Sequence, residues 1–225
     1  MEKTIHILSR DEILKAGKIF YWATQDDYKL WFFDSLARSR RMEVMLPRLV
    51  RNKKLVSKQV GKKLVYAVPS HKNESVIHGL GCTQMLIRIS KSTPHDMVYL
   101  VGNFRGIGSI PDVGFQYGEK LLLCEFSTEN NFEGAKIIKT KMTKYIQNLD
   151  KILERFKVYK AKSVIVLFVI DVSRERVLNF VKRNNLNGMF YFTDYETFKS
   201  VSIGTQLSAP IYIWIDGESY PLKKC

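Results

Sequence analysis

Apolar side chains in residues 1–70 recur at helical spacing and then give way to two short β-branched runs. Ser9 and Glu12 have the spacing of a capping box, in which a hydroxyl and a carboxylate each accept a hydrogen bond from a backbone N–H at a helix start. The apolar positions that follow predict a helix over about 10–21. Asp26 and Asp27 then begin a second helical segment that runs to residue 36.

A third helical segment covers residues 39–52, where the apolar positions fall on one face. Four arginines lie off that face: Arg40, Arg41, Arg48 and Arg51. Pro47 argues against an uninterrupted helix, so a turn before it and a helix that begins at it both remain open. Two β-branched runs around Gly61 then predict a hairpin over 53–68. Its lysines are Lys53, Lys54, Lys58, Lys62 and Lys63.

Two helices, an arginine-bearing helix and a basic hairpin follow one another in the order of a winged helix-turn-helix. We therefore predict a DNA-binding domain over residues 1–70. In such a domain the third helix fits the major groove and the hairpin rests on flanking phosphates. A winged helix that pairs only with protein is the alternative. The hairpin holds five lysines and no acidic residue, which favours DNA.

Beyond a polar break at 68–73, helical and strand patterns alternate and predict a second domain over residues 71–225. Helices are expected over 74–90, 132–157 and 173–184, the last capped by Ser173. Strands are expected over 97–104, 110–116, 120–126, 163–170, 189–192 and 210–214. This pattern predicts an α/β (α+β) domain in which a mixed sheet is flanked by helices.

The charge of the chain strengthens the expectation of a polyanionic partner. The chain holds 36 Lys and Arg against 22 Asp and Glu, a net charge of +14. Residues 1–70 carry 15 basic and 7 acidic side chains, so the positive charge is densest there. The three cysteines and four histidines have the spacing of neither a disulfide framework nor a zinc site. No apolar run has the length of a signal peptide or a membrane helix, so we expect a cytoplasmic protein without membrane contact.

Two acidic residues of the second domain are candidates for chemistry. Asp112 begins one predicted strand and Glu125 lies near the end of the next. If a turn at 117–119 joins these strands as antiparallel neighbours, both carboxylates lie at one end of the sheet, where oxygen ligands suit Mg²⁺ and phosphodiester hydrolysis. Alternatively, Asp112 only caps a turn and Glu125 is a surface carboxylate. Glu125 stands in an apolar run, where an unpartnered charge is costly, and this favours a specific role.

A helix, a Pro111-Asp112 strand, a Glu125-bearing strand and a further helix together resemble the PD-(D/E)XK nuclease fold. The third signature of that fold is a lysine two residues after the second acid, and here that position is Ser127. Such a lysine can migrate to the following helix. The candidates there are Lys136, Lys139 and Lys141.

The whole chain resembles, more specifically, the replication-relaxation family of plasmids and integrative elements. Besides the arginine-bearing helix and the hairpin, the shared features are His78-Gly79-Leu80, Pro111-Asp112, residues 125–129, Lys141 and Tyr145. The resemblance implies a winged helix joined to a nuclease-like domain, a bacterial mobile element as its home, and a role in replication or conjugative mobilisation. The family more usually has an acid where Ser127 stands.

Three functions remain open from the sequence. The first is an accessory factor that binds double-stranded DNA and recruits a relaxase, a replication initiator or another protein. Such a factor needs no cofactor and is compatible with a homodimer. The missing signature lysine favours this function. The second is a Mg²⁺-dependent endonuclease with Asp112 and Glu125 as metal ligands, Lys141 as the catalytic lysine, and Glu74 as a further acid. The third is a transcriptional regulator whose C-terminal part dimerises or senses.

Overall fold

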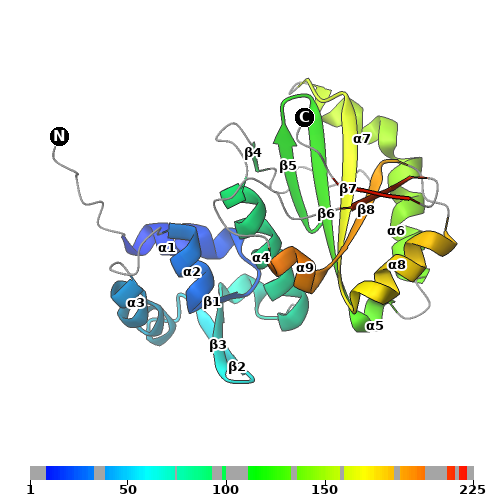
Figure 1. Ribbon diagram of the computed structural model, residues 1–225. Helices are drawn as coiled ribbons and strands as arrows, with labels where there is room; N and C mark the ends of the chain where they lie inside the picture. The colour runs from blue at the N-terminus through cyan, green and yellow to red at the C-terminus, as the bar shows by residue number, and fades with distance from the viewer. Residues whose placement is uncertain are drawn as a thin grey trace, which may run out of the picture. The chain divides into compact units, whose positions relative to one another are not determined.

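Figure 1 shows the computed structural model, which describes residues 9–32, 39–73, 75–92, 98–99, 111–132, 136–157, 160–184, 188–200, 212–215 and 218–221. The chain forms two compact units, Met1–Ile87 and Arg88–Cys225. We predicted a boundary between residues 70 and 71, but the division falls inside helix α4 (Val76–Ser92). The polar break therefore does not separate the units, because the first turns of α4 pack on the first unit.

The predicted order of helices and hairpin is confirmed in the first unit. Its elements are α1 (Arg10–Ile19), β1 (Ala23–Thr24), α2 (Gln25–Phe32), α3 (Ser39–Arg51), β2 (Val56–Val60), β3 (Lys63–Ala67) and the 3-10 helix η2 (Pro69–His71), which precedes α4. The strands form an antiparallel sheet in the order β1-β3-β2. Strand β1 was not predicted, because a strand of two residues is too short for an alternating pattern.

Capping boxes start both α1 and α2. The Ser9 backbone N–H donates to Glu12 Oε2 at 2.7 Å, and the Glu12 N–H donates to Ser9 Oγ at 3.2 Å, as predicted. At α2, the Thr24 N–H donates to Asp27 Oδ2 at 2.7 Å, and the Asp27 N–H donates to Thr24 Oγ1 at 3.2 Å. The second helix therefore begins at Gln25, before the position that Asp26 and Asp27 suggested.

Helix α3 runs through Pro47 without interruption, so neither of the two boundaries left open from the sequence exists. Proline removes one backbone donor and disfavours a helix interior. Here Pro47 lies on the exposed side, and Met42, Leu46 and Leu49 are buried on the opposite side. Burial of this apolar stripe outweighs the lost hydrogen bond, because each buried side chain contributes about 1.5–3 kcal/mol.

The start of α4 closes the core of the first unit. A Cβ on Gly79 would lie 2.8 Å from Trp22 Cδ1 and 3.0 Å from Tyr21 Cβ, so only glycine permits this approach. Further along α4, the Gln84 amide donates to Asp27 Oδ1. Asp27 is fully buried and also accepts from Thr24 Oγ1 at 2.8 Å, and burial raises the pKa of its carboxyl. Asp27 thus joins α2 to α4.

A mixed sheet forms the centre of the second unit, as predicted. Its strands are β4 (Val98–Tyr99), β5 (Val113–Tyr117), β6 (Lys120–Thr128), β7 (Ser163–Asp171), β8 (Phe190–Asp194), β9 (Tyr212–Ile215) and β10 (Glu218–Pro221), in the spatial order β10-β9-β8-β7-β6-β5-β4. The strands β6, β7 and β8 are parallel, and the other neighbours are antiparallel. Of the predicted strand 97–104, only Val98 and Tyr99 lie within the described residues.

Four helices pack their apolar sides together against one face of this sheet. They are α5 (Glu129–Phe132), α6 (Lys136–Gln147), α7 (Leu149–Arg155) and α8 (Arg174–Arg183), and Figure 1 shows α6, α7 and α8 beside β7 and β8. Alternate residues of the strands supply the sheet side of the core, including Leu121, Leu123, Val166, Phe168 and Phe190. Helix α9 (Tyr195–Ser200) follows β8 directly.

Two expectations for the second unit need correction, and some of its elements were not expected. The helix predicted over 132–157 is divided into α6 and α7 at Asn148, whose amide donates to the Lys144 carbonyl at 2.8 Å. Ser173 occupies the N-cap position of α8, but its side chain makes no capping hydrogen bond. Helices α5 and α9 and strand β10 were not predicted. Among the helices that the structure describes, none has the length and apolar character needed to cross a membrane.

Candidate functional site

The first unit carries a basic surface on α3 and the adjoining hairpin. Arg41, Arg48 and Arg51 are exposed on the side of α3 opposite its buried stripe. The side chain of Arg40 lies outside the described residues. The hairpin segment adds exposed cations at Lys53, Lys54, Lys58, Lys62 and Lys63. We call these eight described side chains, three arginines and five lysines, the basic face.

Two tight turns of the backbone hold lysines of the basic face on the surface. Val60 pairs with Lys63, so Gly61 and Lys62 alone form the hairpin turn, and Gly61 has a φ of 56°. Glycine at the first position of a two-residue turn supplies this positive φ without strain. Lys53 also has a positive φ, 55°, where the chain leaves α3. Its N–H donates to the Val50 carbonyl at 2.9 Å, in a helix-ending turn that usually holds glycine.

Few acids accompany these cations. The hairpin segment 53–68 contains no acidic residue. On α3, Glu43 pairs with Lys29 of α2 at 3.4 Å. The exposed side of α3 also carries Val44, which is 67% exposed between the arginines. A surface with this charge balance is suited to a polyanion.

In the second unit, the register of β5 and β6 brings the two predicted acids together. Val113 pairs with Cys124, so Asp112, immediately before β5, lies opposite Glu125 of β6. The predicted antiparallel arrangement and the shared end of the sheet are therefore confirmed. The alternative in which Glu125 is a surface carboxylate is wrong, because Glu125 is 1% exposed.

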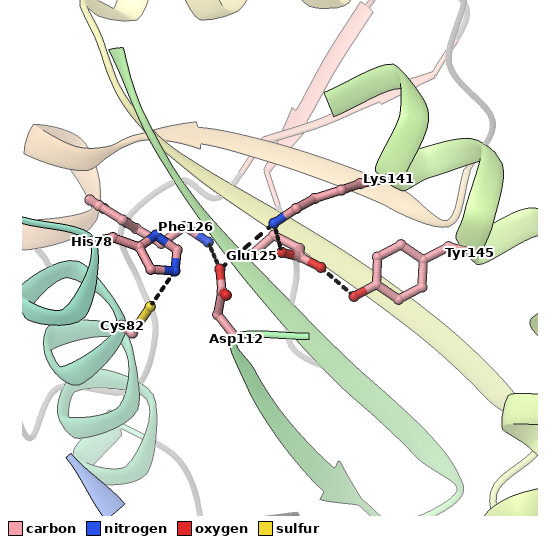
Figure 2. Close-up of polar contacts among 7 residues, drawn as sticks. All are labelled: His78, Cys82, Asp112, Glu125, Phe126, Lys141 and Tyr145. Carbon is pink, nitrogen blue, oxygen red and sulfur yellow. Dashed lines mark hydrogen bonds and ion pairs between the residues drawn. The ribbon is translucent and has the colours of Figure 1, made fainter. Parts of the chain in front are cut away.

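Glu125 is held by two side chains of α6 (Figure 2). Lys141 Nζ donates to Glu125 Oε2, and the Tyr145 hydroxyl donates to Glu125 Oε1 at 2.5 Å. Lys141 Nζ also lies 4.0 Å from Asp112 Oδ2, which accepts from the Phe126 backbone N–H at 2.7 Å. Four side chains, Asp112, Glu125, Lys141 and Tyr145, thus form one cluster, which we call the acid–lysine cluster.

Burial dominates the electrostatics of this cluster. The pKa of Glu125 is raised to about 7, first by burial and then by the neighbouring Asp112 carboxylate, while Lys141 and Tyr145 act in the opposite direction. The pKa of the Tyr145 hydroxyl is also raised, first by burial and then by the charge of Glu125. Tyr145 is therefore a neutral hydrogen-bond donor at every physiological pH.

The nuclease resemblance implies Mg²⁺ between Asp112 and Glu125, and the donor atoms can be tested for that ion. Carboxylate oxygens suit Mg²⁺ in type. However, each Glu125 oxygen already accepts a hydrogen bond, one from an ammonium group that is also 4.0 Å from Asp112. A cation between the two acids would have to displace Lys141. As arranged, the cluster supplies its own counter-charge and does not fit a metal.

Of the three lysines considered as replacements for the missing signature lysine, Lys141 alone reaches the acids among the contacts described. Lys136 and Lys139 are exposed on α6. Ser127, at the signature position, is buried, and its Oγ has no hydrogen-bond partner among the described residues. Glu74, the suggested further acid, lies outside the described residues.

Sequence reasoning missed the hydrogen bond from Tyr145 and the buried Asp27. Tyr145 follows Lys141 by four residues, so both lie on one side of a helix, and this spacing was the available signal. The signal for Asp27 was weaker: the Thr24-x-x-Asp27 spacing of a capping box.

In Figure 2, His78 and Cys82 of α4 are also one turn apart, with Nε2 and Sγ separated by 3.5 Å. A comparison with protein-family models and with curated proteins finds no match to this chain.

Proposed function

We propose that this protein is a DNA-binding accessory protein whose first unit is a winged helix and whose second unit is a non-catalytic, nuclease-like domain. The observation that carries the proposal is the basic face, with eight exposed cations on α3 and the hairpin segment. Each phosphate that such a cation neutralises releases condensed counterions, which favours binding. In this arrangement α3 enters the major groove and the hairpin contacts flanking phosphates.

The state of the acid–lysine cluster supports a non-catalytic second unit. Glu125 is buried, has a pKa of about 7, and is bonded through both oxygens. A carboxyl that is half protonated near neutral pH and paired with lysine is a poor ligand for a divalent cation. The role that remains for the cluster is to hold α6 against β6 and the start of β5.

By this proposal, the protein acts in the replication or mobilisation of a plasmid or another mobile element in the bacterial cytoplasm. The first unit holds double-stranded DNA. The second recruits a relaxase, a replication initiator or another protein, and a homodimer is compatible with the proposal. These roles rest on the family resemblance and on the charge of the first unit.

The test of DNA binding is the salt dependence of affinity for a random-sequence duplex, measured by fluorescence anisotropy. A Lys62→Gln/Lys63→Gln variant should weaken binding to every sequence and reduce the slope of log affinity against log salt by up to about 1.8, since each phosphate contact contributes about 0.9. The matched control is Lys151→Gln/Arg155→Gln, which removes two exposed cations from α7 of the other unit. Equal slopes in wild type and the hairpin variant would exclude the hairpin from the interface.

A Mg²⁺-dependent endonuclease is the second candidate, and one observation favours it. Asp112, Glu125 and a lysine meet in the second unit, with the lysine on the helix after the second acid. Titration calorimetry with Mg²⁺ and Mn²⁺, beside an Asp112→Ala/Glu125→Ala variant and a supercoiled-plasmid cleavage assay, separates the two candidates. We expect neither metal binding nor cleavage by wild type. Saturable binding and cleavage that the variant abolishes would establish the endonuclease instead.

A further inference from the structure

The second unit has an open groove of about 460 Å³ between α6 and α8. This volume lies within the range of about 300–1,000 Å³ that is typical of ligand sites. The polar side chains that line it are Lys139, Arg176, Asn179, Arg183 and Asn184. Three of these five are cations and none is an acid. The groove shares no residue with the acid–lysine cluster or with the basic face.

The floor of the groove is apolar and fixes one of the cations. Phe132 of α5 and Phe180 of α8 are buried, with ring centroids 5.7 Å apart. The guanidinium of Arg176 lies over the Phe132 ring, 5.4 Å from its centroid, and also pairs with Glu129 at 2.5 Å. Arg176 is therefore held in place before any ligand arrives, which reduces the entropy lost on binding.

The other two cations are not neutralised by acids within the described part of the chain. Lys139 and Arg183 are exposed, and no ion pair is described for either. With Glu129 balancing Arg176, the groove keeps a net positive charge from these two side chains. Three of the polar side chains lie along one side of α8, because Arg176, Asn179 and Arg183 recur at intervals of three and four residues.

We propose that this groove binds the phosphodiester backbone of DNA and gives the second unit its own DNA contact. The inference rests on the proposed function, since the same chain already presents a surface for DNA. Guanidinium forks match the oxygens of a phosphate, and a lysine adds a point charge. The open shape suits a continuous strand, whereas a small free ligand is normally enclosed over most of its surface.

The experiment uses the full chain and the duplex anisotropy assay described above. A Lys139→Gln/Arg183→Gln variant leaves Arg176 and its contacts intact and removes only exposed side chains. We expect its salt slope to fall by up to about 1.8, because two phosphate contacts are lost. The Lys151→Gln/Arg155→Gln variant removes the same charge from the same unit outside the groove, and its slope should stay near that of wild type.

Titrations with two other anions test whether the groove binds DNA specifically or any anion. Inorganic phosphate, titrated at constant ionic strength, and polyglutamate of matched charge should each bind wild type far more weakly than the duplex. The inference is overturned if the groove variant and the α7 control have equal slopes. It is also overturned if phosphate or polyglutamate binds the groove as strongly as DNA and the variant loses only that binding. A loss of slope in the hairpin variant alone would leave the proposed function standing and remove the groove from it.

Discussion

Tyr145 and Tyr28 are buried tyrosines that differ in what their hydroxyl groups contact. The Tyr145 hydroxyl donates to the carboxyl of Glu125. The Tyr28 hydroxyl is buried and has no hydrogen-bond partner among the described residues. Removing a donor from a buried carboxyl leaves that group unsatisfied, whereas removing an unpaired hydroxyl relieves a desolvation cost.

We therefore predict opposite outcomes for the two Tyr→Phe substitutions. Tyr145→Phe should lower the free energy of unfolding by roughly 1–3 kcal/mol. Tyr28→Phe should leave it within about 0.5 kcal/mol of wild type or raise it slightly. Urea unfolding at pH 7, followed by circular dichroism, measures both. Equal stability of wild type and Tyr145→Phe would mean that this hydrogen bond does not hold α6 to the sheet.

The raised pKa of Glu125 predicts that the free energy of unfolding depends on pH. Its pKa in the folded chain, about 7, lies above the ordinary value of 4.5, because burial favours the protonated form. The folded state then binds the proton more tightly than the unfolded state does. The resulting stabilisation is complete below about pH 4.5 and is lost as the pH rises through about 7.

The variant that isolates this effect is Glu125→Gln, which cannot ionise. Between pH 5 and pH 8, wild type should lose on the order of 2 kcal/mol more unfolding free energy than Glu125→Gln does. Asp27 and Asp171 also have raised pKa values and act in the same direction, so the difference between the two proteins is the quantity to compare. Parallel pH profiles would show that Glu125 does not titrate in this range.

At the scale of elements, two lysines that follow helices have the left-handed backbone for which glycine is usual. Lys53, after α3, has a φ of 55°, and Lys160, after α7, has a φ of 61°. Their N–H groups donate to the Val50 and Lys157 carbonyls at 2.9 and 2.8 Å. A non-glycine residue with left-handed backbone is strained by about 1 kcal/mol. Lys53 belongs to the basic face, and Lys160 belongs to the other unit.

Glycine at either position should relieve the backbone strain, and only the substitution at Lys53 should affect DNA binding. Lys53→Gly and Lys160→Gly should each raise the unfolding free energy by roughly 0.5–1 kcal/mol. Lys53→Gly should also lower the salt slope by about 0.9, because one phosphate contact is lost. Lys160→Gly, measured in parallel, should leave the slope unchanged. If both variants have the wild-type slope, Lys53 is strained without contributing to DNA binding.

For the whole molecule, the net charge of +14 is divided between two units that are each compact. The hairpin of the first unit and the α6–α8 groove of the second are separate sets of residues on one continuous chain. If both bind the same DNA, the chain joins two weak phosphate sites into one stronger site, as linked binding modules do. Phosphate contacts at separate sites add independently to the salt slope.

Additivity of the slopes is the prediction at this scale. A variant that combines Lys62→Gln, Lys63→Gln, Lys139→Gln and Arg183→Gln should lose about the sum of the two separate slope changes, up to about 3.6. The anisotropy assay with a 30-bp duplex, a length chosen so that two sites have room, measures it. A combined variant whose slope equals that of the hairpin variant would show that one unit alone contacts DNA.

The sequence by itself determined the local features of both units. The Ser9–Glu12 capping box, the hairpin turn at Gly61 and the antiparallel pairing that sets Asp112 opposite Glu125 all depend on neighbouring residues. Helical and strand periodicities are likewise local, so they predicted α1 to α4 and the strands from β5 to β9. The charge density of residues 1–70 is a property of composition and needs no fold.

Only the tertiary structure decided what distant residues do to one another. Helix α3 continues through Pro47 because its buried stripe packs on the unit, and the unit boundary lies in α4 because Gly79 and Gln84 contact residues near position 25. The choice of Lys141 over two other lysines depends on which side of α6 faces the sheet. Packing, burial and the pKa shifts they cause arise between segments far apart in the chain, so no local pattern carries them.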